Sequence, residues 1–208
     1  MRRVQPKQTW RRTSHLIGLD LDHYAAWPRA FGAVPTSWPR WFQFLYIFFT
    51  THMFAAVLIY RLQTFLADAR LGKLATLLSR LNHSLFGVTI GHNVRTTGAL
   101  YIAHGHVVMD GIINLGHGVE LAPFVTLGLS NSSRLAFDLY GPTIGDHVNI
   151  GTGAKVLGPI TIGDDVKIGA NAVVVKDVPS GHSAVGVPAT NIPREPDLGW
   201  KQADSDAS

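Results

Sequence analysis

Aliphatic residues recur at every sixth position along the second half of the chain. They are Ile144, Ile150, Val156, Ile162, Ile168 and Val174, and glycine follows four of them. A second series of apolar or small residues lies four positions after each member: Val148, Ala154, Ile160, Val166, Ala172 and Val178. Each hexad therefore predicts a short strand and a corner, with glycine where the backbone turns tightly.

The same rhythm continues backwards to about residue 88. With one polar exception, its positions are apolar: Ile90, Thr96, Ile102, Met109, Leu115, Leu121 and Leu127. A single coil of this kind cannot bury its own apolar side chains, whereas stacked coils bury one aliphatic layer each. We therefore predict a mainly β protein, a parallel β-helix over about 88–178.

Two interruptions of the spacing predict a functional site, because insertions in a solenoid map to loops on one face, often the binding face. Ile102 and Met109 are seven positions apart, so one extra residue lies within 103–106, a segment that carries His104 and His106. A bulge at this point would change the direction of the side chains. Leu127 and Ile144 are seventeen positions apart, which predicts a long loop over 128–141.

The N-terminal third has a different composition. Residues 1–12 hold five basic side chains, and 27–41 alternate Trp, Pro and Arg, which predicts an irregular cationic and aromatic lead-in. Residues 42–60 contain no Asp, Glu, Lys or Arg over nineteen positions, which makes this segment a candidate membrane span. Leucines at helical spacing then predict an amphipathic helix over 62–85.

The repeats resemble the hexapeptide-repeat acyltransferases, in particular the serine acetyltransferase-like branch. The resemblance covers about 61–193 and rests on the repeat itself, on YIAHGHVVM (101–109), FVTLG (124–128) and AVGVPA (184–189), and on IGTGAKVLGPITIGDDVKIGANAVVVKDVP (150–179). It implies a left-handed β-helix with triangular coils, a homotrimer, acetyl-CoA as acyl donor and His104 as catalytic base. An imidazole suits that role because its pKa lies near neutrality.

Three departures from the branch concern the acceptor side. Ala103 and Thr89 stand where the family has aspartates, and Tyr140-Gly141 stands where it has an Arg-His pair. Since a free amino acid needs charged partners, these departures favour a hydroxyl of a saccharide, glycolipid or surface-polymer precursor as acceptor. Serine, as in cysteine biosynthesis, is the alternative. His106 and Tyr140 are the candidate acceptor-binding residues, and His106 is also the rival base.

The donor side matches the family more closely. Gly128, Thr152 and Ala170 occupy positions whose backbone lines the pantetheine arm, while Lys167 and Lys176 would face the phosphates of coenzyme A. The resemblance places this groove between two subunits.

The resemblance also bears on the N-terminal region. Acetyl-CoA is a cytosolic donor, and one true span with a basic flank inside would put the β-helix on the wrong side of the membrane. Two alternatives stay open for residues 1–85: helices lying in the interface at the inner face of the membrane, or a helical unit that packs on the β-helix or on a sister subunit. We expect a cytoplasmic protein with three segments: 1–87, the β-helix domain 88–194 and a flexible tail 195–208.

Other classes fit less well. The net charge of +4 comes with basic residues beside aromatic and apolar runs, which favours membrane or phosphate partners over nucleic acid. The absence of cysteine excludes disulfides and thiolate chemistry. A zinc carbonic anhydrase on the same fold would need three suitably spaced histidines, and we expect no metal. A non-catalytic β-helix scaffold is the remaining alternative.

Overall fold

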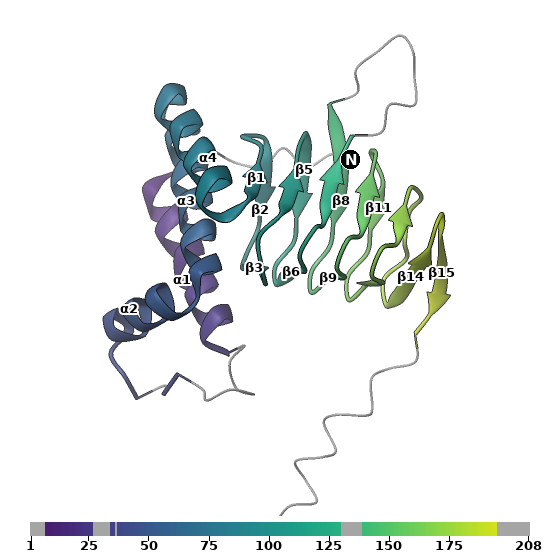
Figure 1. Ribbon diagram of the computed structural model, residues 1–208, viewed down its shortest axis with the longest axis horizontal. Helices are drawn as coiled ribbons and strands as arrows, with labels where there is room; N and C mark the ends of the chain where they lie inside the picture. Colours follow the sequence, from purple (N-terminus) through teal and green to yellow (C-terminus); the bar gives the residue numbers. More distant parts are fainter. Residues whose placement is uncertain (1–6, 27–33, 36, 130–138, 195–208) are drawn as a thin grey trace, which may run out of the picture.

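The computed structural model describes residues 7–26, 34–35, 37–129 and 139–194 of the 208-residue chain. Helices gather at one end of a stack of short strands, as Figure 1 shows. The helices are α1 (Trp10–Ala26), α2 (Arg40–Thr50), α3 (His52–Asp68) and α4 (Gly72–Phe86). The strands form a left-handed β-helix of about five turns, which confirms the predicted fold class.

Three sheets form the faces of the β-helix, and the coils add parallel strands to them in turn. Face A contains β1 (Val88–Ile90), β4 (Val107–Met109), β7 (Thr126–Gly128), β10 (Lys155–Leu157) and β13 (Val173–Val174). Face B contains β2 (Val94–Thr96), β5 (Ile112–Leu115), β8 (Tyr140–Ile144) and β11 (Thr161–Ile162). Face C contains β3 (Leu100–Ile102), β6 (Val119–Leu121), β9 (Asn149–Ile150), β12 (Lys167–Ile168), β14 (His182–Gly186) and β15 (Ala189–Pro193).

The aliphatic positions of the hexads fill the interior of the coils. On face C, Ile102 is in register with Leu121, Leu121 with Ile150, and Ile150 with Ile168. All four are at most 2% exposed. Burying each such side chain contributes roughly 1.5–3 kcal/mol, so the six-residue spacing is the main source of stability for the coils. The layered core predicted from the spacing is confirmed.

The turns between faces define the edges of the β-helix. The C–A edge consists of the turns 103–106, 122–125, 151–154 and 169–172, and each contains one residue with a left-handed backbone: His106, Phe124, Gly153 and Asn171. The A–B edge consists of the turns 91–93, 110–111, 158–160 and 175–177. The predicted loop over 128–141 leaves this second edge, and its residues 130–138 lie outside the described residues.

Side chains from the helices cap the open end of the β-helix. Strands β1, β2 and β3 are the first in their sheets, so one side of each has no neighbouring strand. Gln63 of α3 donates to the carbonyl of Ile90 at 2.8 Å, and Tyr60 donates to that of Val94 at 3.0 Å. Backbone groups that would otherwise be buried without partners are thereby satisfied.

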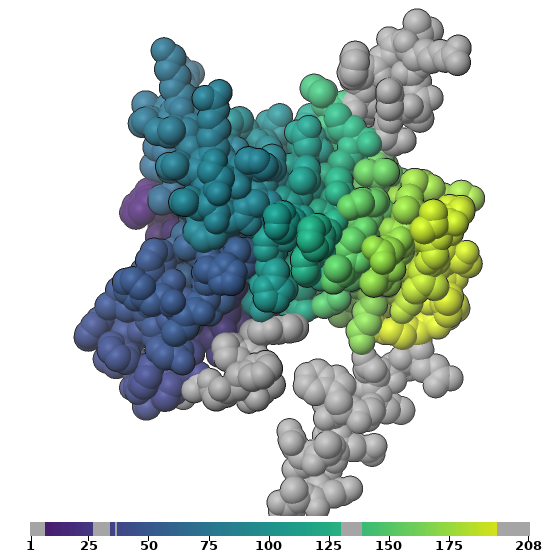
Figure 2. Space-filling model, viewed as in Figure 1, coloured from purple at the N-terminus to yellow at the C-terminus, as the bar shows by residue number. Residues whose placement is uncertain are grey.

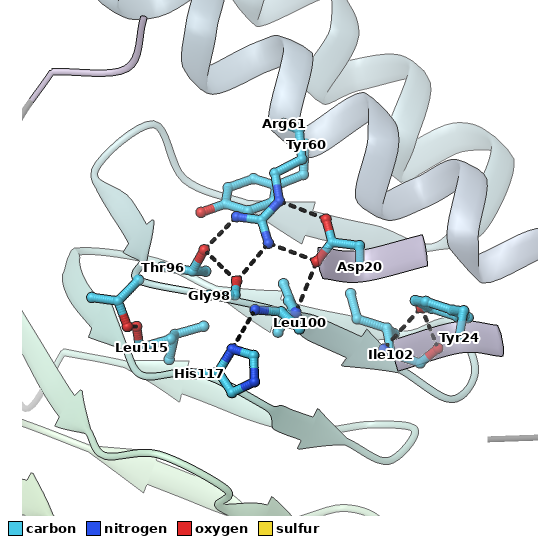
Figure 3. Close-up of polar contacts among 12 residues, drawn as sticks. Asp20, Tyr24, Tyr60, Arg61, Thr96, Gly98, Leu100, Ile102, Leu115 and His117 are labelled. Carbon is cyan, nitrogen blue, oxygen red and sulfur yellow. Dashed lines mark hydrogen bonds and ion pairs between the residues drawn. The ribbon is translucent and has the colours of Figure 1, made fainter. Parts of the chain in front are cut away.

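An ion pair lies at the centre of this cap (Figure 3). Asp20 of α1 accepts two bonds of 2.8 Å from Arg61 of α3, and both side chains are buried. Arg61 also donates to Thr96 and to the carbonyl of Gly98, while Asp20 accepts the backbone N–H of Leu100 at 2.9 Å. With its polar atoms paired in this way, the buried pair joins α1, α3 and the first coil into one unit.

The helical region differs from the sequence prediction in three respects. Helix α1 overlaps the segment 1–12, which was expected to be irregular, at residues 10–12. The uncharged segment 42–60 is not one helix, because α2 and α3 meet at Thr51 with a bend of 109°. The helix predicted over 62–85 is the end of α3 followed by α4, with a turn at Ala69–Leu71 in which Arg70 has a φ of 63°.

Helix α3 is largely buried, whereas α2 and α4 expose apolar side chains. Within the described ranges, no single helix is long and apolar enough to cross a membrane, although α2 and α3 taken together across their bend meet the criterion. The space-filling view shows the helices at one end and β14–β15 at the other (Figure 2). The exposed apolar side chains are Trp41, Phe42, Leu45, Tyr46, Phe48 and Phe49 on α2, and Leu74, Leu77, Leu81 and Leu85 on α4.

Candidate active site

Counted between buried, inward-facing residues, the turn that carries His104 is one residue longer than the corresponding turns of the later coils. Four residues separate the buried Ile102 from the buried Val107, whereas three separate Leu121 from Val125. The extra residue inferred from the sequence therefore lies on the C–A edge, between β3 and β4. This is where a coil departs from regular geometry and can present a side chain differently from its neighbours.

The backbone of the long turn is held between the coil below and helix α4 above. Ala103 donates its N–H to the carbonyl of Leu121 at 2.9 Å. Gly105 lies against the end of α4, where a Cβ on Gly105 would come within 2.1 Å of the carbonyl oxygen of Phe86. The imidazole of His104 is exposed and has no hydrogen-bond partner among the described residues. The backbone is therefore fixed while the ring stays accessible to a substrate.

His106 packs on an aromatic neighbour. Its ring stacks on Phe124 of the next coil, with centroids 5.0 Å apart and planes at 6°. Lys155 then donates to the carbonyl of Phe124 at 2.7 Å. This column of contacts orients His106 along the C–A edge, within the same turn as His104. The stacking gives this ring less freedom than that of His104, and its contact with an acceptor stays a prediction.

A third imidazole, which the sequence analysis missed, lies at the end of α4. His83 Nδ1 is 2.9 Å from the hydroxyl of Thr89, a residue of β1 that is half-buried on face A. Thr89 is in register with Val108, which follows His106 by two positions. The six-residue separation of His83 and Thr89 gives no sign of this contact, because one residue lies in a helix and the other in a strand.

Two of the predicted donor residues lie on the same edge as His104. Thr152 and Ala170 occupy the third and fourth turns of the C–A edge, and both are exposed. Three steps of about 4.8 Å between coils put Ala170 about 14 Å along the edge from the turn of His104. Within the described part of the chain, the backbone N–H groups of Thr152 and Ala170 have no acceptor, so they are available to the amide carbonyls of a pantetheine arm. Lys167 precedes this edge on face C.

The other predicted residues lie on or beside the A–B edge. Gly128 ends β7, Tyr140 begins β8, and Lys176 lies in the turn after β13. The width of face A separates this edge from His104. The structure therefore does not bring all the predicted residues together within one chain.

A groove of about 990 Å³ follows face B and does not include His104. Its floor carries outward-facing side chains of successive strands, among them Arg95, Asn114 and Thr143, and Tyr140 lies at its margin. Arg95 is paired with Asp68 of α3 at 2.8 Å. Among the described residues, no three His, Asp or Glu side chains are arranged to hold a metal ion.

Comparison with known proteins agrees with the fold. Residues 141–176 match the family model described as "Bacterial transferase hexapeptide (six repeats)". A serine acetyltransferase of Helicobacter pylori is 40% identical over 141 residues, which cover 67% of this chain and 81% of that protein. The crystal structure of Neisseria gonorrhoeae serine acetyltransferase aligns with a TM-score of 0.76 at 30% identity, covering 95% of this chain and 70% of that chain. Brucella abortus serine acetyltransferase in complex with coenzyme A gives a TM-score of 0.74 at 28% identity, covering 88% of this chain and 68% of that chain.

These comparisons correct the predicted acceptor class. A saccharide, glycolipid or surface-polymer precursor was inferred from three positions, Ala103, Thr89 and Tyr140-Gly141, where charged family residues are missing. The relatives named above are serine acetyltransferases, and the match extends far beyond those positions, so the inference from the three positions is wrong. The inference took no account of polar side chains from other elements, such as His83, whose imidazole lies beside Thr89.

The remaining family-level predictions are confirmed: hexapeptide repeats, acyl transfer and acetyl-CoA as the donor. Sequence identity over most of a relative's length and a shared fold over nearly the whole chain lead to the same assignment. The chain belongs to the serine acetyltransferase family of hexapeptide-repeat acyltransferases.

Proposed function

We propose that the protein transfers the acetyl group of acetyl-CoA to the side-chain hydroxyl of L-serine, with His104 as general base. The observation that supports this most strongly is an exposed imidazole on the longer turn of the C–A edge, in a chain 40% identical to a serine acetyltransferase. Of the histidines at this edge, His104 is the one with a fixed backbone and an unstacked ring.

The chemistry needs little beyond a base and hydrogen-bond donors. His104 takes the hydroxyl proton as the oxygen attacks the thioester carbonyl, so that a C–O bond forms. When the tetrahedral intermediate collapses, the C–S bond breaks and the imidazolium returns the proton to the leaving thiolate of coenzyme A. A developing oxyanion requires hydrogen-bond donors, and the backbone N–H groups of residues 104–106 have no acceptor within the described part of the chain.

Because this chain lacks the charged residues of the family pattern, other groups must bind serine. His83 lies in the last turn of α4. Its imidazole and the hydroxyl of Thr89 beside it are hydrogen-bonding groups suited to the carboxylate of serine. This assignment places the acceptor on face A, between the end of α4 and the turn of His104.

A direct assay tests the proposed reaction. Purified full-length protein is incubated with acetyl-CoA and L-serine, and both coenzyme A release and O-acetylserine are measured, with His104→Ala as the control. We expect equal amounts of the two products at millimolar serine. Protein that binds acetyl-CoA but forms no O-acetylserine at any serine concentration would overturn the proposal.

We also propose that the protein is a homotrimer. The predicted site residues lie on two edges of one chain, and a cyclic arrangement would bring the C–A edge of one subunit beside the A–B edge of the next. The groove between the two subunits would then hold coenzyme A. Light scattering coupled to size-exclusion chromatography should give a mass of three chains, or a multiple of it, and a monomer would contradict the proposal.

Finally, we propose that the enzyme is cytoplasmic and contacts the inner face of the membrane through α2. This helix buries only Gln43 and Ile47 and exposes aromatic side chains, with Trp41 at 65% and Phe49 at 79%. Aromatic residues on an exposed helix face are suited to the headgroup region, and the basic residues near the N-terminus are attracted to anionic lipid.

The test is flotation with anionic liposomes. We expect full-length protein to float and a Trp41→Ser/Phe49→Ser variant to remain in the soluble fraction. Substitution is preferable to deletion of residues 1–60, because that segment contains Asp20, Tyr24 and Tyr60, which cap the β-helix. Equal flotation of both proteins, or flotation of neither, would rule out attachment through α2.

A further inference from the structure

The residue Ile102 ends the strand that leads into the turn of His104, and its backbone is held by a single side chain. Strand β3 is the first strand of face C, so its outer side has no strand neighbour. The hydroxyl of Tyr24 accepts the N–H of Ile102 at 3.0 Å and donates to its carbonyl at 3.1 Å, as Figure 3 shows. One phenol therefore replaces the two backbone bonds that a preceding coil would supply.

Tyr24 is itself firmly placed. Its side chain is 1% exposed, and its ring lies 5.3 Å from that of Phe54 and 4.7 Å from that of Tyr101. Burial raises the pKa of the phenol, so the hydroxyl stays protonated and can donate and accept together. Helix α1 is held to the same coil by Asp20, which accepts the N–H of Leu100.

We propose that Tyr24 is a positioning residue for the catalytic turn, acting on His104 through the backbone of Ile102. This inference rests on the proposed role of His104 as base. Tyr24 fixes the backbone two residues before His104 from the side of the helices, while the bond from Ala103 to Leu121 fixes the next residue from the side of the second coil. Without the phenol, the N–H and the carbonyl of Ile102 would lose their partner on the outer side of β3, directly before the turn.

The distance of His104 from the reacting hydroxyl depends on this attachment. The ring of His104 has no hydrogen-bond partner among the described residues, so its position follows from its backbone. A displacement of about 1 Å in a catalytic group can lower a rate by up to about a hundredfold. The effect should appear in kcat and leave donor binding unchanged, because the donor residues Thr152 and Ala170 lie on later coils.

The chain offers a matched control in Tyr60. It is also buried, also caps an edge strand and also donates to a carbonyl, that of Val94 at 3.0 Å. Val94 belongs to face B, away from the C–A edge. Replacing either tyrosine with phenylalanine removes one buried hydroxyl, but only Tyr24→Phe releases the strand that enters the turn of His104.

The experiment compares Tyr24→Phe, Tyr60→Phe and the unaltered enzyme in steady-state kinetics, thermal unfolding and amide hydrogen exchange. We expect Tyr24→Phe to lower kcat about tenfold, with the KM for acetyl-CoA unchanged within about twofold. Exchange should become faster in a peptide that spans 100–107. Tyr60→Phe should lower the unfolding midpoint by a similar amount and leave kcat within about twofold of the unaltered enzyme.

Each other outcome counts against the inference. An unchanged kcat in folded Tyr24→Phe, or equal losses of kcat in the two variants, would assign both tyrosines to stability alone. A Tyr24→Phe variant that fails to fold would also assign Tyr24 to stability alone. If His104→Ala keeps its activity, the proposed base is wrong instead, so failure of the inference and failure of the proposed function are distinguishable.

Discussion

His104 combines a backbone fixed on two sides with an imidazole that no neighbouring side chain holds among the described residues. We predict that His104→Ala lowers kcat for acetyl transfer by about a hundredfold or more, because the hydroxyl then attacks without a base. The dissociation constant for acetyl-CoA, measured by calorimetry, should stay within about twofold. His106→Ala should lower kcat less, since that ring stacks on Phe124. The opposite ranking of the two variants would make His106 the base.

His83 gives a separate prediction at the residue scale. If its imidazole binds the carboxylate of serine with Thr89, His83→Ala should raise the KM for serine about tenfold while the KM for acetyl-CoA stays the same. The matched control is His92→Ala, which removes a half-buried imidazole that contacts Gln63 near the A–B edge. Equal KM values for serine in the His83 variant and the unaltered enzyme would place the acceptor elsewhere on face A.

The contact between α4 and the long turn determines how these histidines are presented. Gly105 faces the carbonyl of Phe86, and an added methyl group would lie 2.1 Å from that oxygen. We predict that Gly105→Ala lowers the free energy of unfolding by about 1–3 kcal/mol and also lowers kcat, because the end of α4 or the turn must move. Chemical denaturation and steady-state assays measure the two effects.

Gly72→Ala is the control, since a Cβ there would meet no atom within 4 Å and the residue begins the same helix. The greater helix propensity of alanine should leave its stability unchanged or slightly raised. If Gly105→Ala and Gly72→Ala have the same free energy of unfolding and the same kcat, close packing between α4 and the turn does not position His104.

The strands could be predicted from the sequence, whereas much of the helical cap could not. The six-residue period identifies inward positions such as Ile150 and Ile168 directly, and the seven-residue step locates the long turn. Helix α1 gives no comparable signal, because its buried face includes Asp20, whose partner Arg61 is 41 positions away. A buried carboxylate in a single sequence looks like a surface residue until its partner is known.

The candidate site could likewise be predicted only in part, because some of its contacts join residues that are distant in the sequence. Local spacing singled out His104, and the resemblance supplied Thr152 and Ala170, which lie on its edge. The contact of His83 with Thr89 depends on how α4 ends against β1, and the contact of Tyr24 with Ile102 joins residues 78 positions apart. Neither contact follows from a repeating pattern in the sequence. The prediction of the acceptor class was wrong because it relied on charged family residues that this chain lacks. Side chains that could bind serine in their place cannot be identified from the sequence.

At the scale of the whole molecule, the predicted residues divide between two edges of one chain. Gly128 lies at the A–B edge, and the nearest atom to an added Cβ there is a methyl of Leu157 at 3.6 Å, an ordinary contact. A Cβ at this buried position therefore meets no clash, and thermal unfolding checks that the Gly128→Phe chain is folded. Its new side chain would obstruct a coenzyme A bound between that edge and the C–A edge of a neighbouring subunit. Both Gly128→Phe and His104→Ala should be nearly inactive as separate proteins.

Co-expression of these two inactive chains tests whether each site is shared. In randomly mixed trimers, half of the C–A edges and half of the A–B edges are intact, so about a quarter of the sites combine an intact edge of each kind. We predict about a quarter of the unaltered specific activity for the mixture. The control pairs His104→Ala with Ala170→Trp, another substitution on the C–A edge. That pair should regain no activity, because every C–A edge then carries a defect. Absence of restoration with Gly128→Phe, in trimers shown to contain both chains, would place each site within one subunit.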